Sequence, residues 1–152
     1  MSTASALASR SVRAPRTVAL VAAVAGVGVS IYLTIEHYSS SLTLACPETS
    51  TINCLKVTTS KWATIAGVPV AVLGLAYFVV MTGLLAIRSQ HRRLETVRLA
   101  SASAGLVMVF YLLFIELYKV DAICLWCTAV HLLTAIMFVA VLWENLAVRA
   151  AS

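Results

Sequence analysis

Four long stretches of the chain contain no charged side chain, and they constrain the fold more than any other feature of the sequence. These stretches are residues 17–35, 62–87, 99–115 and 122–143. A helix needs roughly 17–25 mainly apolar residues to cross the hydrocarbon core of a bilayer. In a chain of 152 residues, four such helices leave no room for a second large domain. We therefore predict an all-α polytopic membrane protein whose four transmembrane helices form one bundle.

The overall composition excludes several other classes of protein. Hydrophobic residues make up 61% of the chain and charged residues 11%, whereas soluble domains have about 45–50% apolar and about 25% charged residues. An ordinary cytosolic enzyme, a disordered chain and a nucleic-acid-binding module are therefore excluded. Residues 1–15 are small and polar, so we expect a disordered cytoplasmic N-terminus there. We expect residues 16–149 to form the four-helix membrane domain.

The distribution of positive charge predicts how the helices are oriented. Eight of the 11 lysines and arginines lie before the first apolar stretch, between the second and third, or after the fourth. The other three are Lys56, Lys61 and Lys119. Loops that are rich in lysine and arginine stay in the cytoplasm. We therefore predict a multi-pass protein of the inner or plasma membrane with both termini in the cytoplasm. The loop between the first two helices is then extracytoplasmic.

The four cysteines form two pairs on the side of the membrane that this orientation places outside. Cys46 and Cys54 lie in the loop between the first two helices, and Cys124 and Cys127 lie at the start of the last helix. Disulfides form and persist outside the cytosol. Two pairs on this side indicate redox chemistry, structural bridges or metal binding.

The two pairs differ in what their spacing predicts. Cys124 and Cys127 would lie on one face of a helix, and Asp121 as N-cap would put Cys124 in the first turn. There the free N–H groups and the helix dipole favour a thiolate, although two such cysteines can also pack simply as small hydrophobes. The loop pair on its own is typical of an inert structural disulfide. Two dithiols within reach of each other are, however, what relayed thiol–disulfide exchange requires.

The motifs between the two pairs, in this order, resemble the vitamin K epoxide reductase (VKOR) family. They are Ser60-Lys61-Trp62, Gly67-Val68-Pro69 and a glycine inside the second helix, Gly74. The resemblance covers about residues 17–148. It implies a four-helix bundle that encloses a quinone, either menaquinone or ubiquinone. It also implies that the last-helix pair is the active-site disulfide and that the loop pair is an electron shuttle.

The resemblance also implies a role for each cysteine. Cys127 would face the quinone, and Cys124 would be its disulfide partner. Cys54 would exchange with Cys124, and Cys46 would meet an external dithiol protein. Many bacterial members carry a fused thioredoxin-like domain, whereas this chain stops at Ser152. We therefore expect a separate, DsbA-like partner with a thioredoxin fold on the extracytoplasmic side.

The quinone contacts that we expect are His131, Ser60, Trp62 and Trp126. His131 stands four residues after Cys127 and so shares its helix face. Animal members have a tyrosine at this place and an asparagine in the second helix, which this chain lacks. This departure favours simple quinone reduction over reduction of vitamin K epoxide. Near the outer surface, Glu116 and the lysine three residues later are expected to form an ion pair.

The predicted function is a membrane oxidoreductase that oxidises a secreted dithiol protein, reduces a quinone and so supports disulfide formation. A DsbB-type enzyme is the alternative within this class, but its CxxC motif follows the first helix. Outside the class, a mercuric-type metal carrier would need cytoplasmic cysteine ligands, which the predicted topology does not provide. A structural four-helix membrane protein with inert disulfides is the third alternative. We expect neither a metal site nor nucleic-acid binding.

Overall fold

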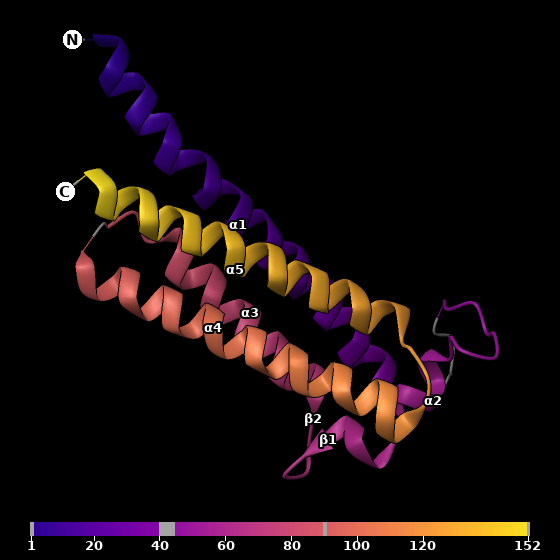
Figure 1. Cartoon of the computed structure of the whole chain (residues 1–152). Helices are drawn as coiled ribbons and strands as arrows, with labels where there is room; N and C mark the ends of the chain where they lie inside the picture. Colours follow the sequence, from indigo (N-terminus) through magenta and orange to yellow (C-terminus); the bar gives the residue numbers. More distant parts are fainter. Residues whose placement is uncertain (1, 40–44, 90, 152) are drawn as a thin grey trace.

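Helices make up most of the protein in the computed structural model, which describes residues 2–39, 45–89 and 91–151 and, of their side chains, those of residues 14–150. Four helices lie alongside one another in an elongated bundle (Figure 1). They are α1 (Ser2–Tyr38), α3 (Val70–Ala86), α4 (Arg92–Ile115) and α5 (Leu125–Ala151). Residues 2–15 belong to α1 in the structure, whereas the sequence predicts a disordered segment over residues 1–15, which stays a prediction.

Short elements connect the helices at one end of the bundle. Between α1 and α3 the chain forms α2 (Cys54–Thr58), the 3₁₀ helix η1 (Lys61–Ala63) and two antiparallel strands, β1 (Thr64–Ile65) and β2 (Val68–Pro69). A π-helical turn, η2 (Glu116–Val120), follows α4 directly and leads to α5.

The apolar stretch 62–87 does not form one continuous helix, contrary to its prediction as a single membrane span. Its first part forms η1, β1 and β2, and only α3 is α-helical. Ala66 and Gly67 have φ angles of 52° and 81°, which produce the tight turn between the strands. Pro69 then precedes α3, where its missing N–H is not needed by the helix.

Within the described residues, three helical segments are long and apolar enough to cross a membrane. They are Ala14–Tyr38, Arg92–Val120 and Leu125–Ala150, whereas Val70–Ala86 is a shorter apolar helix. The prediction that the chain is a mainly helical membrane protein is therefore confirmed. Three of the four expected membrane helices reach the length that a membrane span needs.

Small residues on α1 allow the helices to pack closely in the core. Ala19, Ala22 and Ala23 of α1 lie in one buried cluster with large side chains of α3 and α5, such as Phe78 and Met137. The α1 helix packs against both α3 and α5, and α5 also packs against α4. α1 and α5 thus hold the bundle together.

Gly26 and Gly28 provide a matched test of this packing. A Cβ atom on Gly26 would overlap the buried ring of Phe78, whereas nothing lies within 4 Å of a Cβ atom on Gly28. We expect Gly26→Ala to lower the free energy of unfolding by about 1–3 kcal/mol through overpacking. Gly28→Ala should leave it unchanged or raise it by up to about 1 kcal/mol, since alanine favours helix. Reversible unfolding in mixed micelles measures both, and equal losses would contradict the close contact between α1 and α3.

Two arginines cap the end of α3 that lies away from the cysteines. The Arg16 guanidinium donates to the carbonyl oxygen of Leu85 at 2.9 Å, and Arg98 donates to that of Leu84 at 2.9 Å. Both also donate to the carbonyl oxygen of Ile87. The last carbonyl groups of a helix have no partners within it. Arg16 and Arg98 therefore satisfy the groups that α3 leaves open where it ends.

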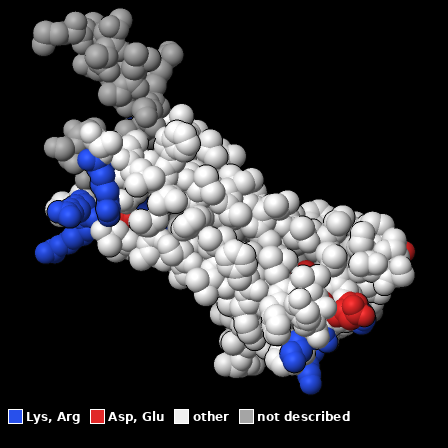
Figure 2. Space-filling view, viewed as in Figure 1, with Lys and Arg blue, Asp and Glu red and all other residues white. Residues whose placement is uncertain are grey.

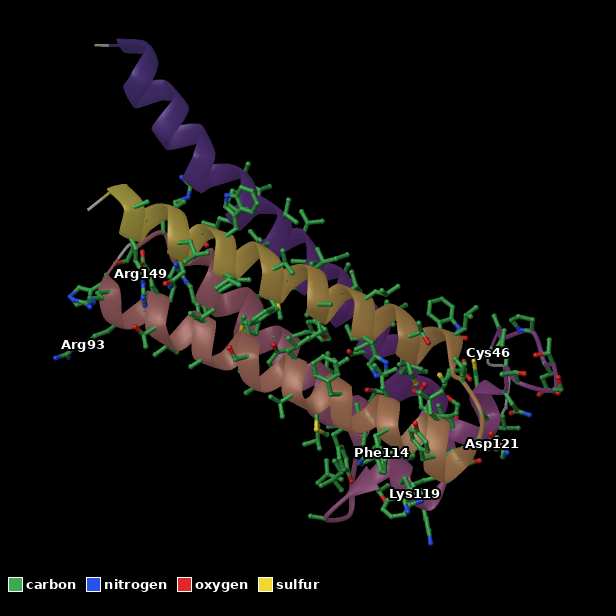
Figure 3. The ribbon with its side chains drawn as sticks, in the orientation of Figure 1. Cys46, Arg93, Phe114, Lys119, Asp121 and Arg149 are labelled. Carbon is green, nitrogen blue, oxygen red and sulfur yellow. A yellow bond between two sulfur atoms is a disulfide. The ribbon has the colours of Figure 1, made fainter. Side chains whose placement is uncertain are left out.

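Exposed charges gather at the two ends of the bundle, and the visible face between them is almost free of charge (Figure 2). Arg93 and Arg149 lie at one end, whereas Cys46, Lys119 and Asp121 lie at the other (Figure 3). Most of the arginines are thus separated from the cysteines by the length of the bundle, as the charge pattern predicts.

Candidate functional site

All four cysteines lie at the end of the bundle where α5 begins. Cys46 and Cys54 are joined by a disulfide, with their Cα atoms 6.2 Å apart. Cys124 and Cys127 are free thiols. Cys54 is 1% exposed and Cys124 is fully buried, whereas Cys46 is half-buried. Cys46 is therefore the more exposed of the two bonded cysteines.

Backbone pairing docks the loop onto the segment that precedes α5. Ile52 and Ile123 form a parallel β-bridge. The N–H of Asn53 donates to the carbonyl oxygen of Ile123 at 3.1 Å, and the N–H of Ile123 donates to that of Thr51 at 2.9 Å. These bonds fix the residue before Cys54 beside the residue before Cys124.

The cap of α2 then directs the Cys54 sulfur toward α5. The Asn53 side chain accepts a hydrogen bond from the N–H of Lys56 at 2.8 Å, so α2 begins at Cys54. The N–H of Leu125 donates to the Sγ atom of Cys54 at 3.3 Å. Because Leu125 directly follows Cys124, the Cys54 sulfur lies at the first residue of α5, next to the second cysteine pair.

Side-chain packing beneath the loop supports the same arrangement. Val57 and Trp62 pack against a small buried cluster made of Ile115, Val120 and Ala122. Ile115 ends α4, and Val120 and Ala122 lie in the connection between α4 and α5. The loop therefore rests on the connection that leads to the CxxC motif.

Cys124 caps α5, and the prediction of Asp121 as N-cap is wrong. α5 begins at Leu125, and the Cys124 sulfur accepts a hydrogen bond from the N–H of Cys127 at 3.2 Å. Asp121 has left-handed backbone angles and ends η2 instead. Hydrogen bonds from the Cys127 thiol and backbone lower the pKa of Cys124, although burial and the nearby Glu116 carboxylate oppose them. The N-terminus of α5 thus favours the Cys124 thiolate, although Cys124 lies at the cap and not in the first turn, where the sequence placed it.

A cavity of about 300 Å³ lies inside the bundle next to this pair. All four long helices contribute to its mainly apolar wall, with residues such as Leu33, Phe78, Met108 and Val130. Pockets for small ligands in proteins have volumes of about 300–1,000 Å³ and are lined mostly by apolar groups with a few polar ones. The cavity is therefore suited to a small, largely apolar ligand.

Three of the four predicted quinone contacts line this cavity together with Cys127: Ser60, Trp62 and His131. Ser60 is held by its own hydrogen bond, in which its hydroxyl donates to the carbonyl oxygen of Val57 at 2.8 Å. Among the described side chains, His131 has no hydrogen-bond partner for Nδ1, although it is only 5% exposed. Its Nδ1 atom is thus available to a ligand in the cavity.

Trp126 lies outside the cavity lining and contacts the cysteine loop instead. Its ring lies against that of Tyr32, with centroids 4.8 Å apart. Its Nε1–H donates to the carbonyl oxygen of Ala45 at 3.1 Å, and the N–H of Ala45 donates to the Tyr32 hydroxyl at 3.2 Å. Trp126 therefore holds the residue next to Cys46. Its predicted contact with a quinone stays a prediction.

Glu116 also lines the cavity, and the sequence analysis missed this position. The expected ion pair with Lys119 is absent from the described residues, because Glu116 is buried while Lys119 is exposed. A spacing of three residues is typical of a surface ion pair on an α-helix, but the chain forms a π-helical turn here. The sequence did contain one signal of a functional role for Glu116: an acidic residue at the end of an apolar stretch.

A family of known proteins matches most of the chain. The model of the vitamin K epoxide reductase family matches residues 17–142. The chain belongs to this family. The resemblance drawn from the cysteine order and the motifs between the pairs is therefore confirmed. Membership of the VKOR family implies a membrane thiol oxidoreductase.

No curated protein matches the chain. Within the described residues, no group of three or more histidine, cysteine or acidic side chains could hold a metal ion.

Proposed function

We propose that the chain carries electrons from a reduced dithiol protein outside the cytoplasm to a quinone in the membrane, and thereby supports disulfide formation in secreted proteins. The observation that carries this proposal is the hydrogen bond from the N–H of Leu125 to the Cys54 sulfur. It places the loop pair within reach of the CxxC pair. Cys127 in turn lines the apolar cavity.

In this proposal all four long helices cross the membrane, with both termini in the cytoplasm. The arginine-rich end supports this orientation, because such ends stay in the cytoplasm. α3 has 17 residues, which is the lower limit for a membrane span. The loop between α1 and α3 is then extracytoplasmic.

The first step takes place at Cys46, because Cys46 is more exposed than Cys54. A thiolate of the partner attacks the Cys46 sulfur and releases the Cys54 thiolate. The partner's second thiol then breaks this mixed disulfide, which leaves the partner oxidised and both loop cysteines reduced. A separate thioredoxin-fold protein, whose two thiols are close together, fits this step.

The second step moves the two electrons to α5. The Cys54 thiolate attacks Cys124 of a Cys124–Cys127 disulfide and releases the Cys127 thiolate. Cys46 then attacks Cys54, re-forms the loop disulfide and releases Cys124. The product has a loop disulfide and two free thiols on α5, which is the arrangement in the structure.

The cavity fits a quinone in the last step. When bound, a quinone accepts two electrons and two protons and leaves as the quinol. His131 is placed to hold a carbonyl oxygen, since its buried Nδ1 has no other partner among the described residues. Ser60 and Trp62 complete the wall at the outer end. Cys124 and Cys127 re-form their disulfide as they give up the electrons.

Complementation tests this function directly. The chain is expressed in a bacterial strain that lacks its own periplasmic thiol oxidase, together with a secreted reporter that needs a disulfide. We expect the wild-type chain to restore oxidation of the reporter, and an equally inserted Cys127→Ser variant to fail. If the wild-type chain inserts fully and the reporter stays reduced, with a DsbA-like partner present, the proposed function is wrong.

A further inference from the structure

Glu116 is a buried acid at the centre of the proposed site. It is the first residue of η2 and is 4% exposed. Its Oε2 atom is buried and has no hydrogen-bond partner in the described part of the chain. A buried polar group without a partner costs free energy, and acids at membrane depth are rare outside functional sites. A structural role therefore accounts poorly for this carboxyl group.

The backbone holds Glu116 in the turn that precedes Cys124. The N–H of Ala122 donates to the Glu116 carbonyl oxygen at 3.2 Å, which closes the wide turn of η2. A charge on the Glu116 carboxyl group raises the pKa of Cys124, so the two side chains lie close together. Glu116 also lines the cavity beside Cys127 and His131. Among the described lining residues, Glu116 is the one carboxylate.

The proton balance of the last step leaves a role for such a group. Formation of the quinol takes two electrons and two protons. Closing the Cys124–Cys127 disulfide supplies both electrons, but it supplies two protons only if both cysteines are thiols. The exchange with Cys54 releases Cys124 as a thiolate, and the N–H of Cys127 donates to its sulfur at 3.2 Å. Cys124 therefore enters this step without a proton, and Cys127 supplies one. A second proton must come from elsewhere in the cavity.

We propose that Glu116, in its protonated form, donates the second proton to the quinone while Cys124 and Cys127 close their disulfide. This inference rests on the proposed function. The Glu116 carboxylate regains its proton from those that the next partner dithiol releases when it is oxidised. Over one cycle, the partner loses two electrons and two protons, and the quinol carries both away. His131 holds the substrate by a hydrogen bond and does not change its protonation state.

The test compares Glu116→Gln with Glu48→Gln, which removes an exposed acid from the cysteine loop. Each purified protein in lipid nanodiscs receives dithiothreitol and a short-chain menaquinone. Removal of a general acid typically costs 10²- to 10⁴-fold in rate. We expect Glu116→Gln to reduce the quinone about 100-fold or more slowly than wild type, and Glu48→Gln to match wild type.

A second readout separates proton donation from a structural effect. Acid quenching followed by alkylation with a mass tag measures the redox state of the cysteines during turnover. Because electrons still reach α5, Cys124 and Cys127 should accumulate as free thiols in Glu116→Gln. Without quinone, dithiothreitol should reduce this pair at the wild-type rate, within about threefold.

Several outcomes would overturn the inference. One is a quinone reduction rate in Glu116→Gln within about threefold of wild type. Another is accumulation of the Cys124–Cys127 disulfide, which would place the block before α5. If Glu116→Gln does not fold, Glu116→Asp decides: we expect at most about a tenfold loss, and a folded variant that loses 100-fold overturns the proposal. An inactive wild-type chain would instead contradict the proposed function itself.

Discussion

Replacing Cys127 with serine is expected to trap a disulfide between Cys54 and Cys124 and to lower quinone reduction by roughly 1,000-fold or more. The Cys124 thiolate can attack the Cys54 sulfur and release Cys46, because Cys54 already touches the first residue of α5. In the wild-type protein, the Cys127 thiol breaks this intermediate by attacking Cys124. Serine cannot do so, and the intermediate persists.

Cleavage between the two halves of the chain detects the trapped bond. A site for a specific protease is inserted between α3 and α4, and the cleaved protein is run on a non-reducing gel. We expect Cys127→Ser to hold the halves together, and wild type to release them since its disulfide lies within the first half. Addition of Cys124→Ser should abolish the link. With Cys46→Ser added, only the thiols of Cys54 and Cys124 remain, and they should form the link once a thiol oxidant such as diamide is supplied. Separate halves in Cys127→Ser under every redox condition would contradict the contact between the pairs.

The second large effect is a division between two kinds of electron donor. A reduced thioredoxin-fold protein must enter through the loop, so Cys46→Ser and Cys54→Ser should lose roughly 1,000-fold or more of their turnover with it. A small membrane-permeant dithiol can reach the pair on α5 directly. With this donor, both loop variants should retain activity within about tenfold of wild type, whereas Cys124→Ser and Cys127→Ser should be inactive.

Steady-state quinone absorbance measures all four variants with both donors. Thr49→Ser provides a control, since it changes an exposed residue of the loop and keeps the hydroxyl that accepts from the N–H of Ile52. If the loop variants lose activity equally with both donors, the loop is a structural support for α5 and not a shuttle. If all four serine variants stay active, the cysteines are structural.

The sequence predicted the placement of the cysteines well, because charge and hydropathy act over whole segments. Arg93 and Arg149 lie at the opposite end of the bundle from Cys46 (Figure 3). Ser60, Trp62, Trp126 and His131 were predicted as quinone contacts from the family resemblance and from helical spacing. Three of them line the cavity, Trp126 does not, and contact with a quinone stays a prediction.

Local backbone geometry explains what the sequence did not reveal. The turn at Ala66 and Gly67 interrupts an apolar stretch that contains no charge to mark the boundary. Asp121 is a common N-cap residue, but its left-handed conformation places it at the end of η2. The same π-helical turn moves Glu116 from an expected surface pair into the cavity. These changes depend on a few dihedral angles, and neither composition nor periodicity reports them.

The most direct test of the electron relay is the stoichiometry of one reaction. The wild-type protein in nanodiscs is mixed with a reduced thioredoxin-fold protein as the only donor and menaquinone as the only acceptor, without oxygen. Our account predicts one quinol formed for each partner disulfide, and none with Cys124→Ser. A partner that stays reduced beside a folded wild-type chain, or equal quinol formation with Cys124→Ser, would contradict the relay.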